Sequence, residues 1–300
     1  MNFKSIWAEL EACRNFLGKY GYPAMDKTAI KLGLKPGWFT WVAAVSLFGT
    51  EPFTTAQLMR LFPYGLAQVN DECFISAVDQ GYLSSESGIF RASEVGLETV
   101  RHIFSATDHS FALLQPLSDR QLQTLVGLLF SLAEAAFVMP EPPSHFILNH
   151  KRKLRELTTP TLICYIERYI GELQSYRDDM YIGTWQAHRI ERHTWELLDI
   201  LSQNSALTSE GIHEKLSGRG LAQDVCVADG KELIVRGWLE KCSEYYQITP
   251  IGKQARAEAE AETDRLFFLP WACLNMVELE ELSHFAKQLN DKLKEKGYPP

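Results

Sequence analysis

Apolar residues in the first half of the chain follow a helical period three times and then alternate as in short strands. The predicted elements are helices over residues 38–48, 56–61 and about 66–80, strands at 82–83 and 89–91 joined by a polar turn, and a helix that begins near residue 94. Thr54 is placed to cap the second helix, because Gln57 three residues later completes a capping box. Pro63 and Gly65 separate the second helix from the third. The pattern therefore predicts three helices, a hairpin and a fourth helix.

The second half of the chain repeats this order. Helices are predicted over residues 194–201, 208–216 and about 221–235, strands at 238–239 and 245–248, and a last helix over 254–263. Gly218 and Gly220 supply the turn between the second and third helices. Thr208 begins the second helix as Thr54 does in the first half, so we expect both threonines to be helix caps.

Identical residues recur in the same order in the two halves. Thr40-Trp41 recurs as Thr194-Trp195 and Thr54 as Thr208, 154 positions on; Gly65-Leu66-Ala67-Gln68 recurs as Gly220-Leu221-Ala222-Gln223, 155 on; Gly81, Leu83, Gly96, Thr107-Asp108 and Phe111 recur 156 on. One match would arise by chance, but a collinear set with a slowly drifting offset indicates an internal duplication. From their spacing after the hairpin, we expect Thr107-Asp108 and Thr263-Asp264 to cap the next helix, and Phe111 and Phe267 to anchor it in the core.

The most recognisable sequence motif of the chain lies at the end of the second hairpin. Residues 246–253 spell Tyr-Gln-Ile-Thr-Pro-Ile-Gly-Lys, and Gly237-Trp238-Leu239 precedes the hairpin. These motifs resemble the MarR-like class of winged helix-turn-helix proteins, over about residues 38–105 and 192–262. Proteins of that class typically carry one winged helix per chain and dimerise through terminal helices. The resemblance implies a mainly α fold with small two-stranded wings, in which tandem winged-helix repeats are joined by flanking helices into an intramolecular pseudo-dimer.

Further helices flank each repeat, over residues 3–20, 119–139, 162–177 and 278–294. We expect a first repeat at residues 1–140, a linker at 141–160 and a second repeat at 161–300. Pro140, Pro142 and Pro143 place the boundary, since proline cannot continue a helix. The basic run 151–155 that follows is expected to be a solvated linker; contact with nucleic-acid phosphates is the alternative.

Composition and charge narrow the function. The net charge of −8 and the pI near 5.6 disfavour non-specific attraction to phosphate backbones or anionic lipid. The six cysteines form no C-x-x-C motif, which favours a reducing cytoplasm. The most apolar stretch, residues 125–139, contains Glu134 and is too short to span a bilayer, so no membrane association is expected.

In a winged helix the third helix enters the major groove of DNA. The two third helices here have a combined formal charge of about −4, from Asp71, Glu72 and Asp79 in one and Asp224, Asp229, Glu232, Lys231 and Arg236 in the other. The candidate DNA contacts are Arg60, Arg91, Lys215, Arg219, Lys231 and Lys241, with Gln68 and Gln223 as readers of base edges. The favoured function is a non-enzymatic transcription regulator that binds duplex DNA, with response to a ligand left open. The alternative is a scaffold that binds another protein instead of DNA, since in layout the chain also resembles acidic tandem winged-helix partners of kleisin subunits.

Catalytic signals are few. The chain has no H-E-x-x-H, G-x-S-x-G, Walker or G-x-G-x-x-G motif, so we expect no catalytic residues, no metal and no cofactor. Residues 180–189 have no counterpart in the first repeat and are predicted to form a loop. Trp185 and His188, together with Trp195, either line a ligand pocket or plug the interface between the repeats. The plug is the favoured interpretation. The oligomeric state stays open.

Overall fold

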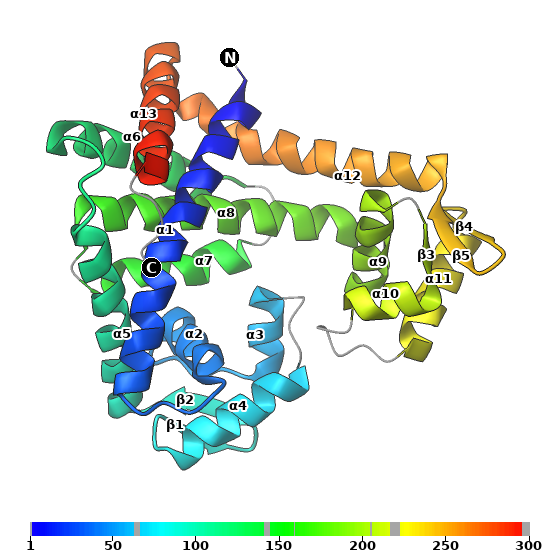
Figure 1. The fold of residues 1–300 in the computed structure, drawn as a ribbon, viewed down its shortest axis with the longest axis horizontal. Helices are drawn as coiled ribbons and strands as arrows, with labels where there is room; N and C mark the ends of the chain where they lie inside the picture. The colour runs from blue at the N-terminus through cyan, green and yellow to red at the C-terminus, as the bar shows by residue number, and fades with distance from the viewer. Residues whose placement is uncertain are drawn as a thin grey trace.

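A computed structural model describes residues 2–62, 67–140, 145–158, 160–204, 206–216 and 223–295. These residues are mainly helical with two small antiparallel sheets (Figure 1). None of the helices in the described ranges is long and apolar enough to cross a membrane.

The first unit has the predicted order of elements. It comprises α2 (Trp38–Phe48), α3 (Thr55–Leu61), α4 (Ala67–Asp79), β1 (Leu83–Glu86), β2 (Ile89–Ala92) and α5 (Glu94–Ala112). The capping box is confirmed: Gln57 N donates to Thr54 Oγ1 over 3.2 Å, and Thr54 N donates to Gln57 Oε1 over 2.8 Å. Trp41 on α2 is buried and stacks on Tyr82 at the base of the hairpin, with ring centroids 4.7 Å apart.

The second unit follows the same order. It comprises α9 (Arg192–Gln203), β3 (Leu207–Thr208), α10 (Ser209–Leu216), α11 (Gln223–Val235), β4 (Leu239–Cys242), β5 (Tyr245–Ile248) and α12 (Pro250–Phe268). Thr208 Oγ1 accepts a hydrogen bond from Gly211 N over 3.2 Å, three residues on as in the first unit. Trp195 on α9 is buried like Trp41, and its ring lies edge-on to Trp238 at the base of the second hairpin.

The same hydrogen bonds close both hairpins onto the following helix. Ser93 Oγ donates to Tyr82 O and accepts from Gly96 N; Thr249 Oγ1 donates to Trp238 O and accepts from Gly252 N. A Cβ at Gly96 or Gly252 would lie 2.1 or 2.2 Å from the same two carbonyl oxygens. Only glycine therefore allows this approach of helix and hairpin.

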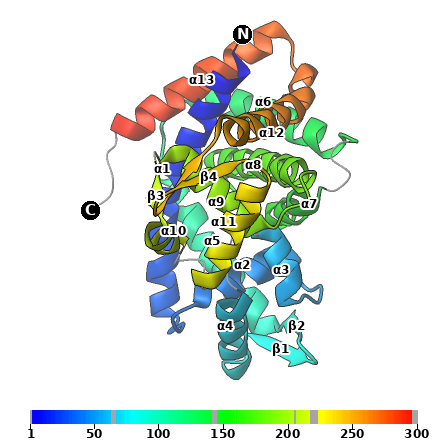
Figure 2. The same ribbon diagram turned by 90° about the vertical axis from the view of Figure 1, so that its right-hand side faces the viewer.

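A helical body joins the two units (Figures 1 and 2). Its long helices are α1 (Phe3–Lys31), α6 (Asp119–Phe137), α8 (Leu162–Gln186) and α13 (Met276–Glu295). Helices α1 and α8, which precede the two units, pack on α5 and α12 respectively, while α6 packs on α8 and α13 on α1. The helix that follows each unit thus packs against the helix that precedes the other, and one apolar core runs through all four.

The expectation of a solvated linker is wrong for the basic run. Residues 146–152 form α7 (Phe146–Arg152), followed by the 3-10 turn η1 (Lys153–Glu156), and both pack on the body. Arg155 binds Glu134 and Glu172, and Arg152 binds Glu134. Charges on distant helices hold this segment, so its basic side chains are not free in solvent. Residues 141–144 lie outside the described residues.

Two further expectations are wrong in detail. Thr107 and Thr263 lie inside α5 and α12, where each hydroxyl donates to the carbonyl four residues earlier, so they cap no following helix. Their partners Phe111 and Phe267 are confirmed as buried anchors, 3% and 0% exposed. Residues 180–186 are the last turns of α8 instead of a loop, because apolar residues there continue its buried side.

Candidate nucleic-acid interface

The third helix of the second unit, α11, shows solvent a face that is close to neutral. Its inner side packs Cys226 and Leu233 into the core of the unit. Exposed on the other side are Gln223, Asp224, Ala228, Lys231 and Val235. The spacing of these residues places them along one helical face. That face carries one acid and one base.

The other two acids of α11 are occupied within the protein. Asp229 is 4% exposed and accepts hydrogen bonds from Thr194 Oγ1 over 2.8 Å and from the His193 ring over 2.8 Å. Glu232 pairs with Arg236 over 2.8 Å on the next turn. A formal charge count treats all of these groups alike, but the two acids serve to hold α11 in place. The face that would meet DNA is therefore less acidic than the sequence suggested.

Arg236 holds the start of the second unit. Its guanidinium donates to the carbonyl oxygens of His188 and Arg189, over 3.1 and 3.2 Å. The sequence alone shows Arg236 only as one more positive charge at the end of the third helix. The spacing of Arg236 from Glu232 does indicate an ion pair between them, since residues four apart on a helix are neighbours.

The second hairpin lies against α11. Tyr246 packs over Gly230, where a Cβ would lie 3.0 Å from the Tyr246 ring. The predicted contact Lys241 is exposed on β4, with its ammonium 5.0 Å from the centre of that ring. Glu240 and Glu244 are exposed beside it. The hairpin thus offers one cation to a phosphate, flanked by two acids.

The remaining candidates of the second unit surround α11. Lys215 is exposed in the last turn of α10, and Gln223 is exposed at the first residue of α11. Arg219 lies outside the described residues. Lys215, Gln223, Lys231 and Lys241 therefore come from three elements of one unit.

The first unit shows a different surface. Its third helix, α4, exposes Asp71, Glu72, Ile75 and Asp79, with Ile75 57% exposed. Asp71 accepts a hydrogen bond from Thr55, and no base lies within α4 to balance the acids. This face would repel a phosphate backbone.

The candidate contacts of the first unit are scattered. Arg60 places its guanidinium 3.9 Å from the centre of the Phe146 ring, and Arg91 is exposed on β2. Gln68 lies in α4, but its side chain is outside the described residues.

The aromatic residues considered for a ligand pocket pack against one another. Trp195 is fully buried, and its Nε1 donates to the Tyr181 hydroxyl over 2.7 Å; the His188 ring stacks on it with centroids 5.5 Å apart. Trp185 is 4% exposed in the same core. In the described ranges, no group of three or more His, Cys, Asp or Glu residues is arranged to hold a metal ion.

The comparison with known families agrees with the second unit. The model of a helix-turn-helix family matches residues 176–300, from the middle of α8 to the end of the chain. The second half of the chain thus contains a helix-turn-helix domain, in which α10 and α11 are the paired helices. Neither the curated proteins nor the solved structures include a match to the chain.

Proposed function

We propose that the chain is a DNA-binding transcription regulator of the MarR-like winged-helix type, built from two copies of one unit. The matched hydrogen bonds of Ser93 and Thr249, 156 positions apart, support the duplication. The exchange of flanking helices supports a pseudo-dimer, because α6 and α13 each pack against the helix that precedes the other unit.

In this proposal the second unit makes the DNA contacts. The observation that carries it is the outward face of α11, on which Gln223 and Lys231 are exposed while Asp229 and Glu232 are held within the protein. A helix in the major groove reads bases through such side chains: glutamine pairs with adenine, and lysine with guanine. Lys215 and Lys241 lie on flanking elements, where phosphates are contacted in a winged helix.

The overall charge sets the strength of binding. With few cations at the interface and a net charge of −8, random duplex DNA should be bound with a Kd of about 10⁻⁴ M or weaker at physiological salt. A specific site should be bound more tightly, because contacts to bases add binding free energy to the small contribution of the phosphate contacts. Tight binding to random DNA with a steep salt dependence would contradict this assignment.

The test is selection of a binding site from a random duplex pool, followed by fluorescence anisotropy on the selected sequence. Gln223→Ala should weaken binding about tenfold, the loss expected for one bidentate base contact. Gln68→Ala is the matched control, since Gln68 stands at the same repeat position in the acidic first unit. The proposal fails if no sequence is enriched, or if the two variants lose affinity equally.

A protein-binding role is the second candidate, and the face of α4 favours it. Ile75 is exposed among Asp71, Glu72 and Asp79, an apolar residue within an acidic rim. A basic partner with an apolar anchor would fit this surface. Failure of the DNA selection, together with partner capture that Ile75→Asp abolishes, would favour this role.

A further inference from the structure

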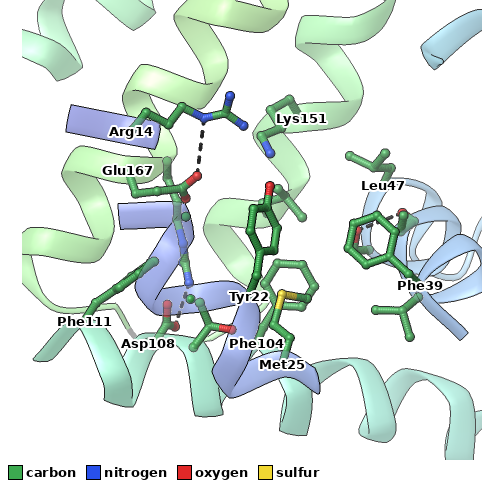
Figure 3. A pocket seen from close by; sticks show the side chains of 18 of the residues that line it. Arg14, Tyr22, Met25, Phe39, Leu47, Phe104, Asp108, Phe111, Lys151 and Glu167 are labelled. Atoms are coloured by element: carbon green, nitrogen blue, oxygen red, sulfur yellow. Dashed lines mark hydrogen bonds and ion pairs between the residues drawn. The ribbon is translucent and has the colours of Figure 1, made fainter. Parts of the chain in front are cut away.

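The two units differ in how they are attached to the helical body. The first unit is held at two places: its α2 faces α1 around an apolar pocket, where Phe39 lies opposite Tyr22 (Figure 3), and its α3 packs on α7. In the second unit α10, the counterpart of α3, makes its main contacts with α9, α11 and β3 of the same unit. The body therefore covers part of α3, whereas α10 packs within its own unit.

This attachment also takes up the basic residue of the first helix pair. In a helix-turn-helix the first helix of the pair crosses the phosphate backbone of the DNA. Arg60 is the basic residue of α3, and its guanidinium lies 3.9 Å from the centre of the Phe146 ring at the start of α7. Lys215, in contrast, is exposed in the last turn of α10. Helix α10 thus presents a cation to a phosphate, while the cation of α3 lies against the body.

The outward faces of the two third helices differ at equivalent positions. Their buried positions match 156 residues apart: Asn70, Phe74 and Ala77 of α4 correspond to Cys226, Gly230 and Leu233 of α11. In this alignment Ile75 corresponds to Lys231, and both side chains are exposed. Asp71 and Asp79 lie one helical turn before and after Ile75. The face of α4 therefore lacks the donor that α11 presents at this position, and acids surround the apolar residue found there.

We propose that the chain recognises one non-palindromic half-site, which the second unit reads in a single major groove, as a complex of one chain with one duplex. This inference rests on the proposed function. A symmetric dimer binds an inverted repeat, with half-site centres about 10 bp apart, because it places two equal recognition helices on the DNA. In this chain the two third helices are unequal, and the first unit serves to hold the body together. The DNA target then needs no second half-site.

The spacing of the two base-reading side chains limits the length of the half-site. Gln223 and Lys231 lie about two turns apart on α11, which is about 12 Å along the helix axis. Base pairs are stacked about 3.4 Å apart along the duplex. The adenine and the guanine that pair with these side chains should therefore lie within about four base pairs of each other.

The test begins with the sequence that the wild-type chain enriches from a random duplex pool. We expect a core without dyad symmetry, and one chain per duplex by analytical ultracentrifugation. A duplex of about 14 bp that holds this core, and one of about 30 bp with room for a second half-site a helical turn away, should be bound with Kd values within about twofold of each other.

Three results would overturn the single half-site while leaving DNA binding itself established. The first is an enriched inverted repeat, and the second is a complex with two chains on one duplex. The third is binding of the shorter duplex that is weaker by more than about fivefold, because it would show that the first unit contacts the flanking DNA.

Exchange of the residues at the equivalent positions tests which unit lies on the DNA. Lys231→Ile should weaken binding of the selected duplex about tenfold, the effect of one lost base contact. Ile75→Lys gives α4 the same cation at an exposed position and should leave the Kd of both duplexes unchanged. Tighter binding of the longer duplex by Ile75→Lys would place the first unit on the DNA and overturn the inference. If no sequence is enriched, or if Lys231→Ile binds as the wild type does, the proposed function fails and the half-site fails with it.

Discussion

Arg155 and Glu172 form a two-armed ion pair in which Nε and Nη2 of the arginine each lie 2.6 Å from a carboxylate oxygen. Glu172 is 1% exposed, and the third guanidinium nitrogen binds Glu134 over 2.7 Å. Three segments meet here: η1 from the region between the two units, α8 from the second half and α6 from the first. This network fixes the connection between the two halves of the chain.

Breaking the pair should destabilise the protein strongly. Glu172→Gln leaves the Arg155 guanidinium partly buried with one counterion fewer, and we expect a loss of roughly 3 kcal/mol in the free energy of unfolding. Urea melts measure it. Glu295→Gln is the control, because its pair with Lys292 is exposed on both sides and should contribute less than about 1 kcal/mol. Equal losses of unfolding free energy in the two variants would show that the buried network does not stabilise the connection between the two halves.

The two acids Asp224 and Asp229 of α11 should respond differently to loss of charge. Asp224 is exposed on the outward face, so Asp224→Asn should tighten DNA binding by removing repulsion. Asp229→Asn removes the same charge from the buried bonds to Thr194 and His193, and should lower stability by about 1–3 kcal/mol. Anisotropy titrations and thermal melts of both variants separate the two effects. Tighter DNA binding by both variants alike would show that net charge alone governs the interaction.

Local features of this fold were predictable from the sequence, and long-range ones were not. The box formed by Thr54 and Gln57 spans three residues, so its geometry follows from the helix start. The surroundings of Arg155 depend on Glu134 and Glu172, 21 and 17 residues away on two other helices, and no local pattern reveals them. The sequence therefore predicts a solvated linker where the structure has a segment held by ion pairs.

The candidate site was predictable to the same extent. The repeat position of Gln223 and the place of Lys231 in the third helix are sufficient to predict both as candidate contacts. The burial of Asp229, in contrast, depends on how α11 is rotated against α9. A count of formal charges does not show which side of the helix is buried. The pairing of Arg14 with Glu167 was missed for the same reason, since the two residues come from α1 and α8.

Phe267 should be a main anchor of the helical body. It is fully buried, and its ring lies edge-on to Trp7 with centroids 4.8 Å apart. Phe267→Ala should cost about 3–5 kcal/mol of unfolding free energy, as a large-to-small change in a packed core. Leu269→Ala, two residues on and 40% exposed, is the control and should cost far less. A loss below about 1 kcal/mol for Phe267→Ala in denaturant melts would contradict its anchoring role.

Asp179 should make stability depend on pH near neutrality. Burial raises the pKa of its carboxyl to about 7, although Ile147 N and Leu148 N donate to it at the start of α7. The folded state therefore holds a proton that the unfolded chain has released between about pH 4 and 7. Across this window the contribution of Asp179 to stability falls as the pH rises, by at most about 1.4 kcal/mol per pH unit, and is constant above it.

The variant Asp179→Asn removes the titration and keeps one acceptor for the backbone donors. Its unfolding free energy, measured by urea melts from pH 4.5 to 7.5, should therefore fall less steeply with pH than that of the wild type. Parallel curves for the two proteins would mean that Asp179 titrates alike in the folded and unfolded states.

Trp185 distinguishes a packed core from a ligand site in the second unit. Its side chain is 4% exposed, and its indole Nε1 is buried without a hydrogen-bond partner among the described residues. As a core residue, Trp185→Ala should cost about 3–5 kcal/mol and lower the melting temperature by several degrees. Trp185→Phe should cost much less, because it keeps most of the ring volume and removes the unsatisfied N–H. A pocket residue would behave differently, with stability unchanged in both variants. Melts of the two variants against the wild type decide between a core role and a pocket role for this residue.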